Sequence, residues 1–454
     1  MKPFLRLALA CLLLASLPAS AQKTLPNPLR NILSLSDLHF NPFYDTALLK
    51  QLITSDYTAW EGIFQSSQKA PNSYGSDVNY PLLRSAFQAM KQELPNPAFV
   101  VISGDFLCHD FQDTYNSYAP NYPDSLQSFT FKTIRFVALM FDRQYPKTPV
   151  LPVLGNNDSD CGDYKLTPGG PFLSVFARAW VGLQRNGSAT ADSSFVKQFA
   201  RGGYYTHPIP GDAKGEIILA NTVFFSSGYA NSCGNPAATP GAEEMKWLDS
   251  VLSKGKASWL VYHIPPGINV HSTVNGYGSC DAKIRLMWSA TFNDQFLTMI
   301  KKYSGQIKAM LAGHTHMDDF RVIYKNGVAA SFIHITPAIS PLFGNNPGFQ
   351  RISWNSVTLG LQNAETFYLN VAKPGAWTAE YNFQKTYNVI GINAMTLARV
   401  RQEILTDTVY RNRYINLYKV SNPGSNEINQ QNWKAFWCGT GALTQQDYSD
   451  CWCK

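Results

Sequence analysis

Side chains that bind metal ions recur at five places in this chain, each directly after a short apolar run. The residues are Asp37, His39, Asp105, Asn156, His263, His314 and His316. Carboxylates, imidazoles and amide oxygens form the ligand set that divalent transition metals favour, with zinc as the first expectation and manganese or iron as alternatives. The spacing predicts a metal site assembled from separate segments.

The predicted ligands suffice for two divalent metal ions. A carboxylate can bridge two cations while imidazoles and an amide oxygen complete each coordination shell. Two such ions roughly 3.5 to 4 Å apart hold a hydroxide between them and clamp phosphoryl oxygens. Gly104, Gly155 and Gly313 stand beside the ligands, where sharp turns would let the side chains point inward. The pattern predicts hydrolysis of a phosphate ester or anhydride.

The apolar runs have the length and composition of strands that are buried on both faces. They span 31–36, 98–103, 150–154, 217–220, 259–262 and 307–312. Helical patterns lie between them at 80–93, 126–143 and 243–252. Strands that alternate with helices predict an α/β domain with its ligand site at the strand ends.

The character of the chain changes after Phe320. Strand-like segments follow at 320–324, 329–335, 349–354 and 358–371, and we expect them to build a second sheet packed on the first. The segment 390–437 is helical in pattern and basic. We therefore predict a catalytic domain over 22–372 and a small helical domain over 373–454.

In order along the chain, the predicted ligands read D-x-H, G-D, G-N-x-D, H and G-H-x-H. This ordered pattern resembles that of the calcineurin-like metallophosphoesterases. The resemblance implies a four-layer α/β/β/α sandwich and two ligand sets that share Asp105. The first set is Asp37, His39, Asp105 and His316, and the second is Asp105, Asn156, His263 and His314.

Further motifs resemble one branch of that family, the acid sphingomyelinase-like phosphodiesterases. The motifs are G-D-F-L-C-H-D at 104–110, H-I-P-P-G at 263–267, N-P-G-F at 346–349 and K-T-Y at 385–387. The similarity runs from about Ser36 to Cys453. It implies hydrolysis of a phosphodiester, with a nucleotide or phospholipid-headgroup type of substrate.

Two departures from that branch matter for function. Sphingomyelinases proper carry a saposin-like domain before the catalytic one, whereas only residues 22–36 precede Asp37 here, so we expect no unaided extraction of sphingomyelin from membranes. The family usually has His where this chain has Asn157, whose amide is a candidate to donate a hydrogen bond to phosphate but cannot deliver a proton near neutral pH. His109, four residues after Asp105, is then the candidate general acid.

The loss of that imidazole keeps two alternatives open. A phosphate leaving group needs protonation less than an alkoxide does, so a phosphoanhydride hydrolase of the endopolyphosphatase or nucleoside triphosphate type is the first alternative. The second is a relative that binds metal and phosphate but has lost catalysis. We place the phosphodiesterase ahead because His314 and His316 are both present.

The start of the chain has the pattern of a secretory signal peptide over 1–21. Lys2 and Arg6 precede an apolar run that ends in Ala19-Ser20-Ala21. We expect a secreted or periplasmic protein without stable membrane insertion, because the apolar run is shorter than the roughly 20 residues that a bilayer requires. The mild net charge of +7 and the absence of basic clusters predict no nucleic-acid binding. We expect a monomer acting on a small phosphorylated substrate.

In an exported chain, we expect the cysteines to be partly paired in disulfides. Seven follow the leader, so at least one is unpaired within the chain. We expect a disulfide from Cys438 to Cys451 or Cys453, which would fasten the end of the chain.

Several polar residues outside the ligand pattern have structural interpretations. His207 and His271 lie in regions that could line a substrate cleft, but we expect them to be loop histidines. We expect His334 to be a core histidine. Asp158 is predicted to hydrogen-bond within its own turn. Asp318 and Asp319 are either partners of the ligating imidazoles or members of a solvated turn.

Overall fold

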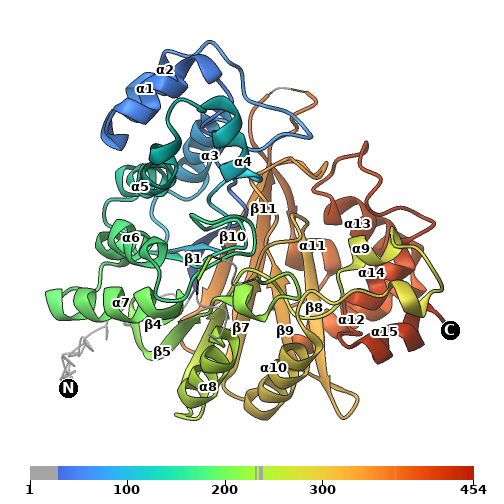
Figure 1. The fold of residues 1–454 in the computed structure, drawn as a ribbon. Coiled ribbons are helices and arrows are strands. Elements are labelled where there is room, and N and C mark those ends of the chain that lie inside the picture. Colours follow the sequence, from blue (N-terminus) through green and yellow to red (C-terminus); the bar gives the residue numbers. More distant parts are fainter. Residues whose placement is uncertain (1–28, 231–232, 235–238, 374) are drawn as a thin grey trace, which may run out of the picture.

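The computed structural model describes residues 29–230, 233–234, 239–373 and 375–454. The predicted signal peptide lies outside these residues. The described chain forms two six-stranded sheets with helices outside them, as Figure 1 shows. This arrangement confirms the α/β prediction.

The first sheet has the strand order β12-β11-β10-β1-β2-β3. Strands β1, β2 and β3 are parallel, and β10 pairs antiparallel with β1. The bounds are β1 Leu29–Leu35, β2 Val100–Ile102, β3 Val150–Pro152, β10 Gly348–Asn355, β11 Leu361–Tyr368 and β12 Thr378–Asn382.

The second sheet has the strand order β4-β5-β6-β7-β9-β8. Its centre, β5 to β7 with β9, is parallel, whereas β4 and β8 at the two edges are antiparallel to their neighbours. The bounds are β4 Tyr205–Ile209, β5 Asp212–Leu219, β6 Ala257–Val261, β7 Ile307–Ala312, β8 Asp319–Lys325 and β9 Val328–Ile335.

The two sheets face each other across an apolar core. On β6, the Trp259 ring lies 5.5 Å from the Trp354 ring of β10 and 5.9 Å from the Phe99 ring beside β2. The next residue, Leu260, points to the opposite side and belongs to a separate cluster with Leu248 and Phe296 on helices. Because successive strand residues face opposite sides, an uninterrupted apolar run is what a sheet covered on both faces requires.

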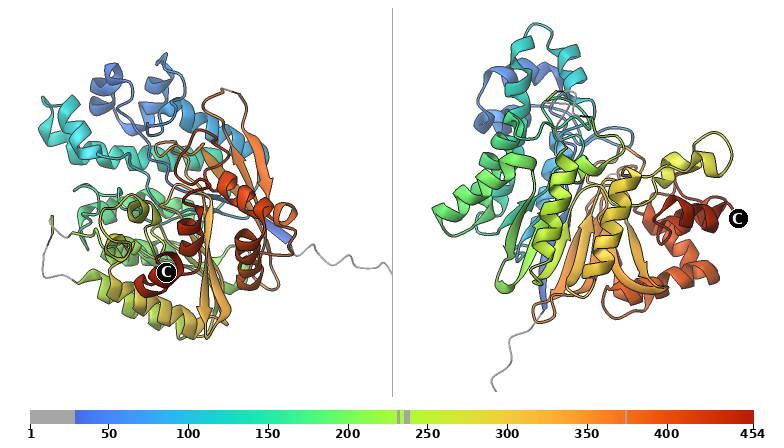
Figure 2. Two further views of the ribbon diagram at one scale, coloured as in Figure 1. Left: turned by 90° about the vertical axis from the view of Figure 1, so that its right-hand side faces the viewer. Right: turned by 60° about the horizontal axis from the view of Figure 1, so that its bottom comes forward.

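Helices cover the outer faces, which completes the four layers implied by the family resemblance (Figure 2). Helices α3 and α5 pack together through Phe87 and Phe141, and α8 and α10 contribute to the apolar cluster behind β6 and β7. The bounds are α1 Leu49–Thr54, α2 Trp60–Gln65, α3 Tyr80–Glu93, α4 Phe111–Tyr118, α5 Leu126–Gln144, α6 Pro171–Trp180, α7 Ala189–Gly202, α8 Pro240–Leu252, α9 Val270–Val274 and α10 Ala290–Tyr303.

The strands after Phe320 differ from the prediction of one added sheet. Strands β8 and β9 extend the second sheet beside β7, whereas β10, β11 and β12 extend the first beside β1. The late strands are thus divided between both sheets, because each original sheet leaves an unpaired edge for them. The domain division at 372 stays a prediction, and β12 beyond it is a member of the first sheet.

The C-terminal segment is helical and is joined to the rest of the chain by disulfides. Its helices are α11 Phe383–Tyr387, α12 Ala394–Thr406, α13 Thr408–Tyr418, α14 Trp433–Gly439 and α15 Gln445–Trp452. The Cys438–Cys451 disulfide confirms one of the two predicted pairings, and Cys280–Cys453 connects the end of the chain to the segment before α10. A third disulfide joins Cys161 to Cys233. Of the described cysteines, buried Cys108 alone is free.

Within the described residues, no helix has the length and apolar character needed to cross a bilayer.

Candidate metal centre

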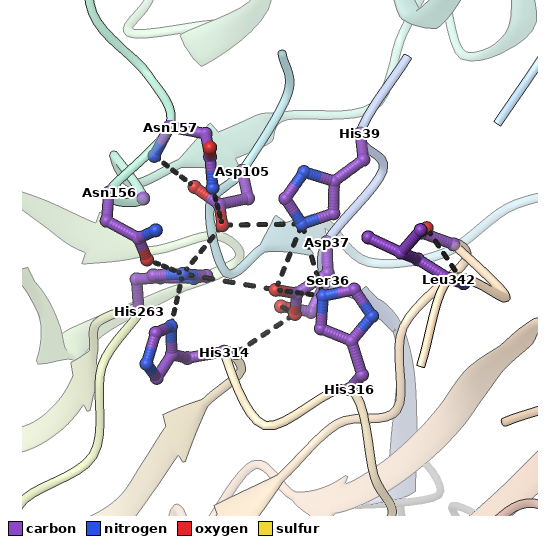
Figure 3. Close-up of polar contacts among 12 residues, drawn as sticks. Ser36, Asp37, His39, Asp105, Asn156, Asn157, His263, His314, His316 and Leu342 are labelled. Atoms are coloured by element: carbon purple, nitrogen blue, oxygen red, sulfur yellow. Dashed lines mark hydrogen bonds and ion pairs between the residues drawn. The ribbon is translucent and has the colours of Figure 1, made fainter. Parts of the chain in front are cut away.

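The predicted ligands follow strands of both sheets, which end at a common edge. Direct backbone hydrogen bonds join the loops there: Asp37 N donates to Gly104 O at 3.0 Å, and Gly313 N donates to His263 O at 3.0 Å. An isolated bridge from Ser36 to Ala338 connects the two sheets. The structure therefore brings all seven predicted ligand residues together, as Figure 3 shows.

The first group surrounds the Asp37 carboxylate. His39 Nε2 lies 3.7 Å from Asp37 Oδ1 and 3.4 Å from Asp105 Oδ2. His316 Nε2 lies 3.5 Å from Asp37 Oδ1 and 3.2 Å from His39 Nε2. His39 Nδ1 donates to Leu107 O at 2.9 Å, which turns Nε2 toward the carboxylates.

The second group surrounds His263. Its Nε2 lies 3.2 Å from Asp105 Oδ2, 3.1 Å from Asn156 Oδ1 and 3.3 Å from His314 Nδ1. His263 Nδ1 donates to Ser103 O at 2.6 Å, so this ring is oriented from behind in the same way as His39. Asp105 Oδ2 lies within 3.4 Å of an imidazole nitrogen in each group, so this carboxylate is placed to bridge them.

The backbone at the predicted ligands is locally strained. Asp37, His39, Asp105, His314 and His316 all have positive φ, between 40° and 72°. Residues other than glycine rarely adopt this left-handed region, and each such conformation costs of order 1 to 3 kcal/mol unless the surrounding structure enforces it. The strain directs side chains from different loops toward one centre.

The Asp37 carboxylate shows that a cation fits here. Oδ2 accepts hydrogen bonds from Ser36 Oγ at 2.5 Å and from His314 N at 3.0 Å. Oδ1 is buried and accepts no hydrogen bond from the residues that the structure describes. Such an oxygen is costly unless a positive charge lies before it. A donor set of carboxylate oxygens and imidazole nitrogens suits divalent transition metals.

The pKa values of the buried imidazoles also bear on metal binding at this site. Burial would lower the pKa of His39 and of His263, but the charge of Asp105 raises them to about 10 and about 9. For His314 and His316, burial prevails and lowers the pKa to about 4 and about 3. Without metal, the His39 and His263 rings are therefore in the doubly protonated imidazolium form at neutral pH. Metal binding must displace one proton from each of these two rings.

Asp158 and Asn157 support the Asp105 loop. As predicted, the Asp158 carboxylate accepts a hydrogen bond within its own turn, from Gly155 N at 2.8 Å. It also accepts from the backbone N–H groups of Asp105, Phe106 and Leu107. Asn157 donates to the Asp105 carboxylate twice, from N at 2.8 Å and from Nδ2 at 3.1 Å. The two hydrogen bonds donated by Asn157 therefore hold the Asp105 carboxylate in place.

His109, the candidate general acid, lies beside the first group. Its ring stacks on His39 with centroids 4.0 Å apart and is 27% exposed. Nδ1 donates to the Asp77 carboxylate at 3.1 Å, and His109 N donates to Asp77 Oδ2 at 2.8 Å. Burial would raise the pKa of Asp77, but the His109 hydrogen bond and nearby imidazoles lower it to about 2. Sequence reasoning missed Asp77, which lies in no motif.

A cleft of about 280 Å³ opens beside the cluster. Asp105, His109 and His314 are among the residues that line it. Residues from several other regions also contribute to its wall, including Asp163, Tyr164, Asn269, His271, Arg321, Phe343, Tyr418 and Glu427. Tyr418 ends α13, so the C-terminal segment forms part of the cleft.

The expectations for the polar residues outside the ligand pattern are confirmed for some residues and wrong for others. His334 is buried, as predicted, with Nε2 2.7 Å from Gln350 Oε1. His271 lies on α9, lines the cleft and donates to Glu427 Oε2 at 2.7 Å, so the loop interpretation of this residue was wrong. His207 lies within β4, buried and hydrogen-bonded to backbone oxygens, and is likewise no loop residue. Asp318 accepts from Gln350 and Thr366 rather than standing in a solvated turn.

Comparison with known proteins agrees with this geometry. A family model described as calcineurin-like phosphoesterase matches residues 30–318. The chain belongs to this family. It is therefore a phosphoric ester hydrolase of the metallophosphoesterase type.

Curated relatives carry the names of the branch that the motifs resemble. The chain is 26% identical over 412 residues to human "Acid sphingomyelinase-like phosphodiesterase 3b", covering 84% of this chain and 81% of that protein. It is 24% identical over 444 residues to mouse "Cyclic GMP-AMP phosphodiesterase SMPDL3A", covering 92% and 90%. Among solved structures, the yellow lupin purple acid phosphatase PPD1 matches with a TM-score of 0.41 and 10% identity, covering 78% of this chain and 53% of the phosphatase.

Proposed function

We propose that this protein is a phosphodiesterase with two divalent metal ions, bound by the seven clustered side chains. The observation that carries the proposal is the position of Asp105, whose Oδ2 lies 3.4 Å from His39 Nε2 in one group and 3.2 Å from His263 Nε2 in the other. One carboxylate shared by two sets of imidazoles is the arrangement that a dinuclear site needs.

In this proposal, Asp37, His39, Asp105 and His316 hold one ion, and Asp105, Asn156, His263 and His314 hold the other. We expect zinc, with manganese or iron as alternatives. When bound, the two cations would acidify a water molecule for attack on phosphorus and would neutralise the phosphoryl oxygens.

The protein side chains then orient the substrate and move the proton. His109 is the group proposed to protonate the leaving oxygen, since its ring lines the cleft beside Asp105. Asp77 holds the ring through Nδ1, which leaves Nε2 as the nitrogen available to substrate. Asn157 keeps the Asp105 carboxylate in place through two donated hydrogen bonds.

The cleft favours a small phosphorylated substrate with a polar leaving group. Its volume of about 280 Å³ and its polar lining residues suit a nucleotide or a phospholipid headgroup. The names of the relatives, which include a cyclic GMP-AMP phosphodiesterase, agree with this substrate class. We propose a monomer that does not bind nucleic-acid polymers.

Asn157 keeps a phosphoanhydride hydrolase as the second candidate. Its amide nitrogen is occupied by Asp105 Oδ2 and cannot supply a proton. An anhydride releases a phosphate, which leaves without full protonation. The phosphoanhydride hydrolase and the phosphodiesterase therefore differ only in the leaving group that the reaction releases.

We also propose that the protein is exported to an oxidising compartment, secreted or periplasmic. Three disulfides support this location, because reducing compartments keep thiols free.

The experiment is metal analysis combined with a substrate panel on the purified mature protein. We expect two metal equivalents per chain, turnover of bis-p-nitrophenyl phosphate and a nucleotide diester, and slower release of phosphate from ATP and polyphosphate. Sphingomyelin presented in vesicles tests the headgroup class. Faster cleavage of ATP or polyphosphate would favour the second candidate. Two bound metals without any turnover would contradict hydrolysis and indicate a binding protein.

A further inference from the structure

A short loop after β3 returns to the metal centre at Asp163. Asp163 Oδ1 accepts a hydrogen bond from Asn156 Nδ2 at 2.8 Å. The oxygen of the same amide, Asn156 Oδ1, lies 3.1 Å from His263 Nε2 (Figure 3). The two ends of the amide thus face opposite partners, a carboxylate on one side and the proposed metal-binding atoms on the other.

This arrangement decides which end of the Asn156 amide faces the cation. An amide oxygen can bind a metal ion, whereas the NH₂ group can only donate. If the amide turned over, its oxygen would face the Asp163 carboxylate and its NH₂ group would face the metal, and both contacts would be repulsive. A hydrogen-bond acceptor at position 163 therefore favours the metal-binding orientation.

Asp163 is itself held by its loop. Tyr164 N donates to Asn156 O at 2.9 Å, and Ala230 N donates to Tyr164 O at 3.0 Å. Two residues before Asp163, Cys161 forms the disulfide with Cys233. The disulfide and these backbone hydrogen bonds tie the loop to the segment around Ala230. Asp163 is exposed and lines the cleft, so its carboxylate stands at the edge of the site.

We propose that Asp163 is a positioning residue for the metal centre, orienting the Asn156 amide so that Oδ1 faces the cation, and that the Cys161–Cys233 disulfide holds Asp163 in place. The proposal rests on the dinuclear site of the proposed function. It assigns to the loop a role in metal affinity that does not involve contact with substrate.

The test measures zinc affinity directly, by competition between the metal-free full chain and a chromophoric chelator. We expect Asp163→Ala to lower the affinity for one of the two zinc ions by about 10-fold to 100-fold, the usual effect of removing the hydrogen-bond partner of a metal ligand. Asp163→Asn should restore most of the affinity, because its amide oxygen can still accept from Asn156 Nδ2. Asp160→Ala is the matched control, since Asp160 accepts from Gln127 on the exposed side of the same loop.

The outcomes separate this proposal from the proposed function. If the wild-type protein binds two zinc ions and Asp163→Ala binds both equally well, the positioning role is overturned. Equal losses in Asp163→Ala and the isosteric Asp163→Asn would also overturn it, because the accepted hydrogen bond would not be the cause. A wild-type protein that binds fewer than two ions overturns the dinuclear site and, with it, this proposal.

The disulfide is tested by the double variant Cys161→Ser with Cys233→Ser, which retains the other two disulfides. We expect about a tenfold weaker affinity for the same single ion, since the loop no longer fixes Asp163. Unchanged zinc affinity in this variant would overturn the part assigned to the disulfide.

Discussion

His109 and Asp77 form a hydrogen-bonded pair at the edge of the metal centre, with His109 Nδ1 3.1 Å from the Asp77 carboxylate. We expect His109→Ala to lower kcat by about 10²-fold to 10³-fold for diesters with an alkoxide leaving group, which needs a proton. The loss should be below about tenfold for p-nitrophenolate, which leaves without one. Comparing steady-state kinetics on the two substrates measures the difference.

Asp77→Asn should lower kcat for the alkoxide substrate by about 10-fold to 100-fold, because the oriented ring loses its anionic acceptor. His207→Gln serves as the control, since His207 lies in β4 outside the cleft. Equal losses on both leaving groups would assign His109 a structural role instead.

Asn157 permits a gain-of-function experiment. We expect Asn157→His to raise kcat for alkoxide leaving groups by about tenfold, because an imidazole can deliver a proton near neutral pH and an amide cannot. Turnover of p-nitrophenyl esters should change little. A uniform fall on every substrate would show instead that the hydrogen bonds donated to Asp105 outweigh proton delivery.

Gly155 is required by close packing against the shared carboxylate. A Cβ atom there would lie 2.0 Å from Asp105 Oδ1 and 2.4 Å from Asp105 N. We expect Gly155→Ala to abolish binding of both metals and to cost about 1 to 3 kcal/mol of folding free energy. Urea denaturation and metal analysis measure the two effects.

Gly62→Ala is the matched control for that experiment, because the added Cβ in α2 meets no atom within 4 Å. It should keep both metals and gain about 0.5 to 1 kcal/mol from helix propensity. Metal binding by Gly155→Ala at the wild-type level would contradict the packing argument.

Glu244 makes stability depend on pH. It is fully buried in α8, and burial raises its pKa well above the ordinary 4.5. The folded protein therefore keeps this proton at pH values where the unfolded chain has released it. The contribution to stability is full below about pH 4 and is lost as the pH rises through the folded pKa.

Glu244→Gln should remove this loss, because the amide keeps an acceptor for Asn221 N without a charge. We expect the variant to be more stable than the wild type at pH 8, with the difference vanishing toward pH 4. Urea denaturation across this pH range provides the measurement. Glu243→Gln, exposed in the same helix turn, should change nothing. A stability gain independent of pH would contradict titration of Glu244.

Local pattern predicted the elements well where one chain segment carries the signal. The apolar periodicity at 80–93 matches α3 residue for residue, and the run at 307–312 is β7. The strands after Phe320 were recognised individually, but their distribution between the sheets was not. Sheet membership depends on which edge offers unpaired hydrogen-bonding groups, and this is a property of the assembled fold.

The same distinction holds for the residues around the metal centre. Asp77 reaches His109 from 32 positions earlier, and the sequence marks neither the pairing nor its direction. Asp163, by contrast, lies only seven residues after Asn156 in the loop that begins near Gly155. This short separation is a sequence signal that could have predicted the contact.

By itself, the sequence determined the types of the seven predicted ligand residues, their place after strands and the chemistry that such atoms support, because these properties belong to side chains and short segments. Only the tertiary structure decided that the predicted ligands come from two sheets meeting at one edge, and that Asp77 and Asp163 accept hydrogen bonds from His109 and Asn156. Hydrogen bonds between distant loops depend on how the sheets pack, which no local pattern specifies.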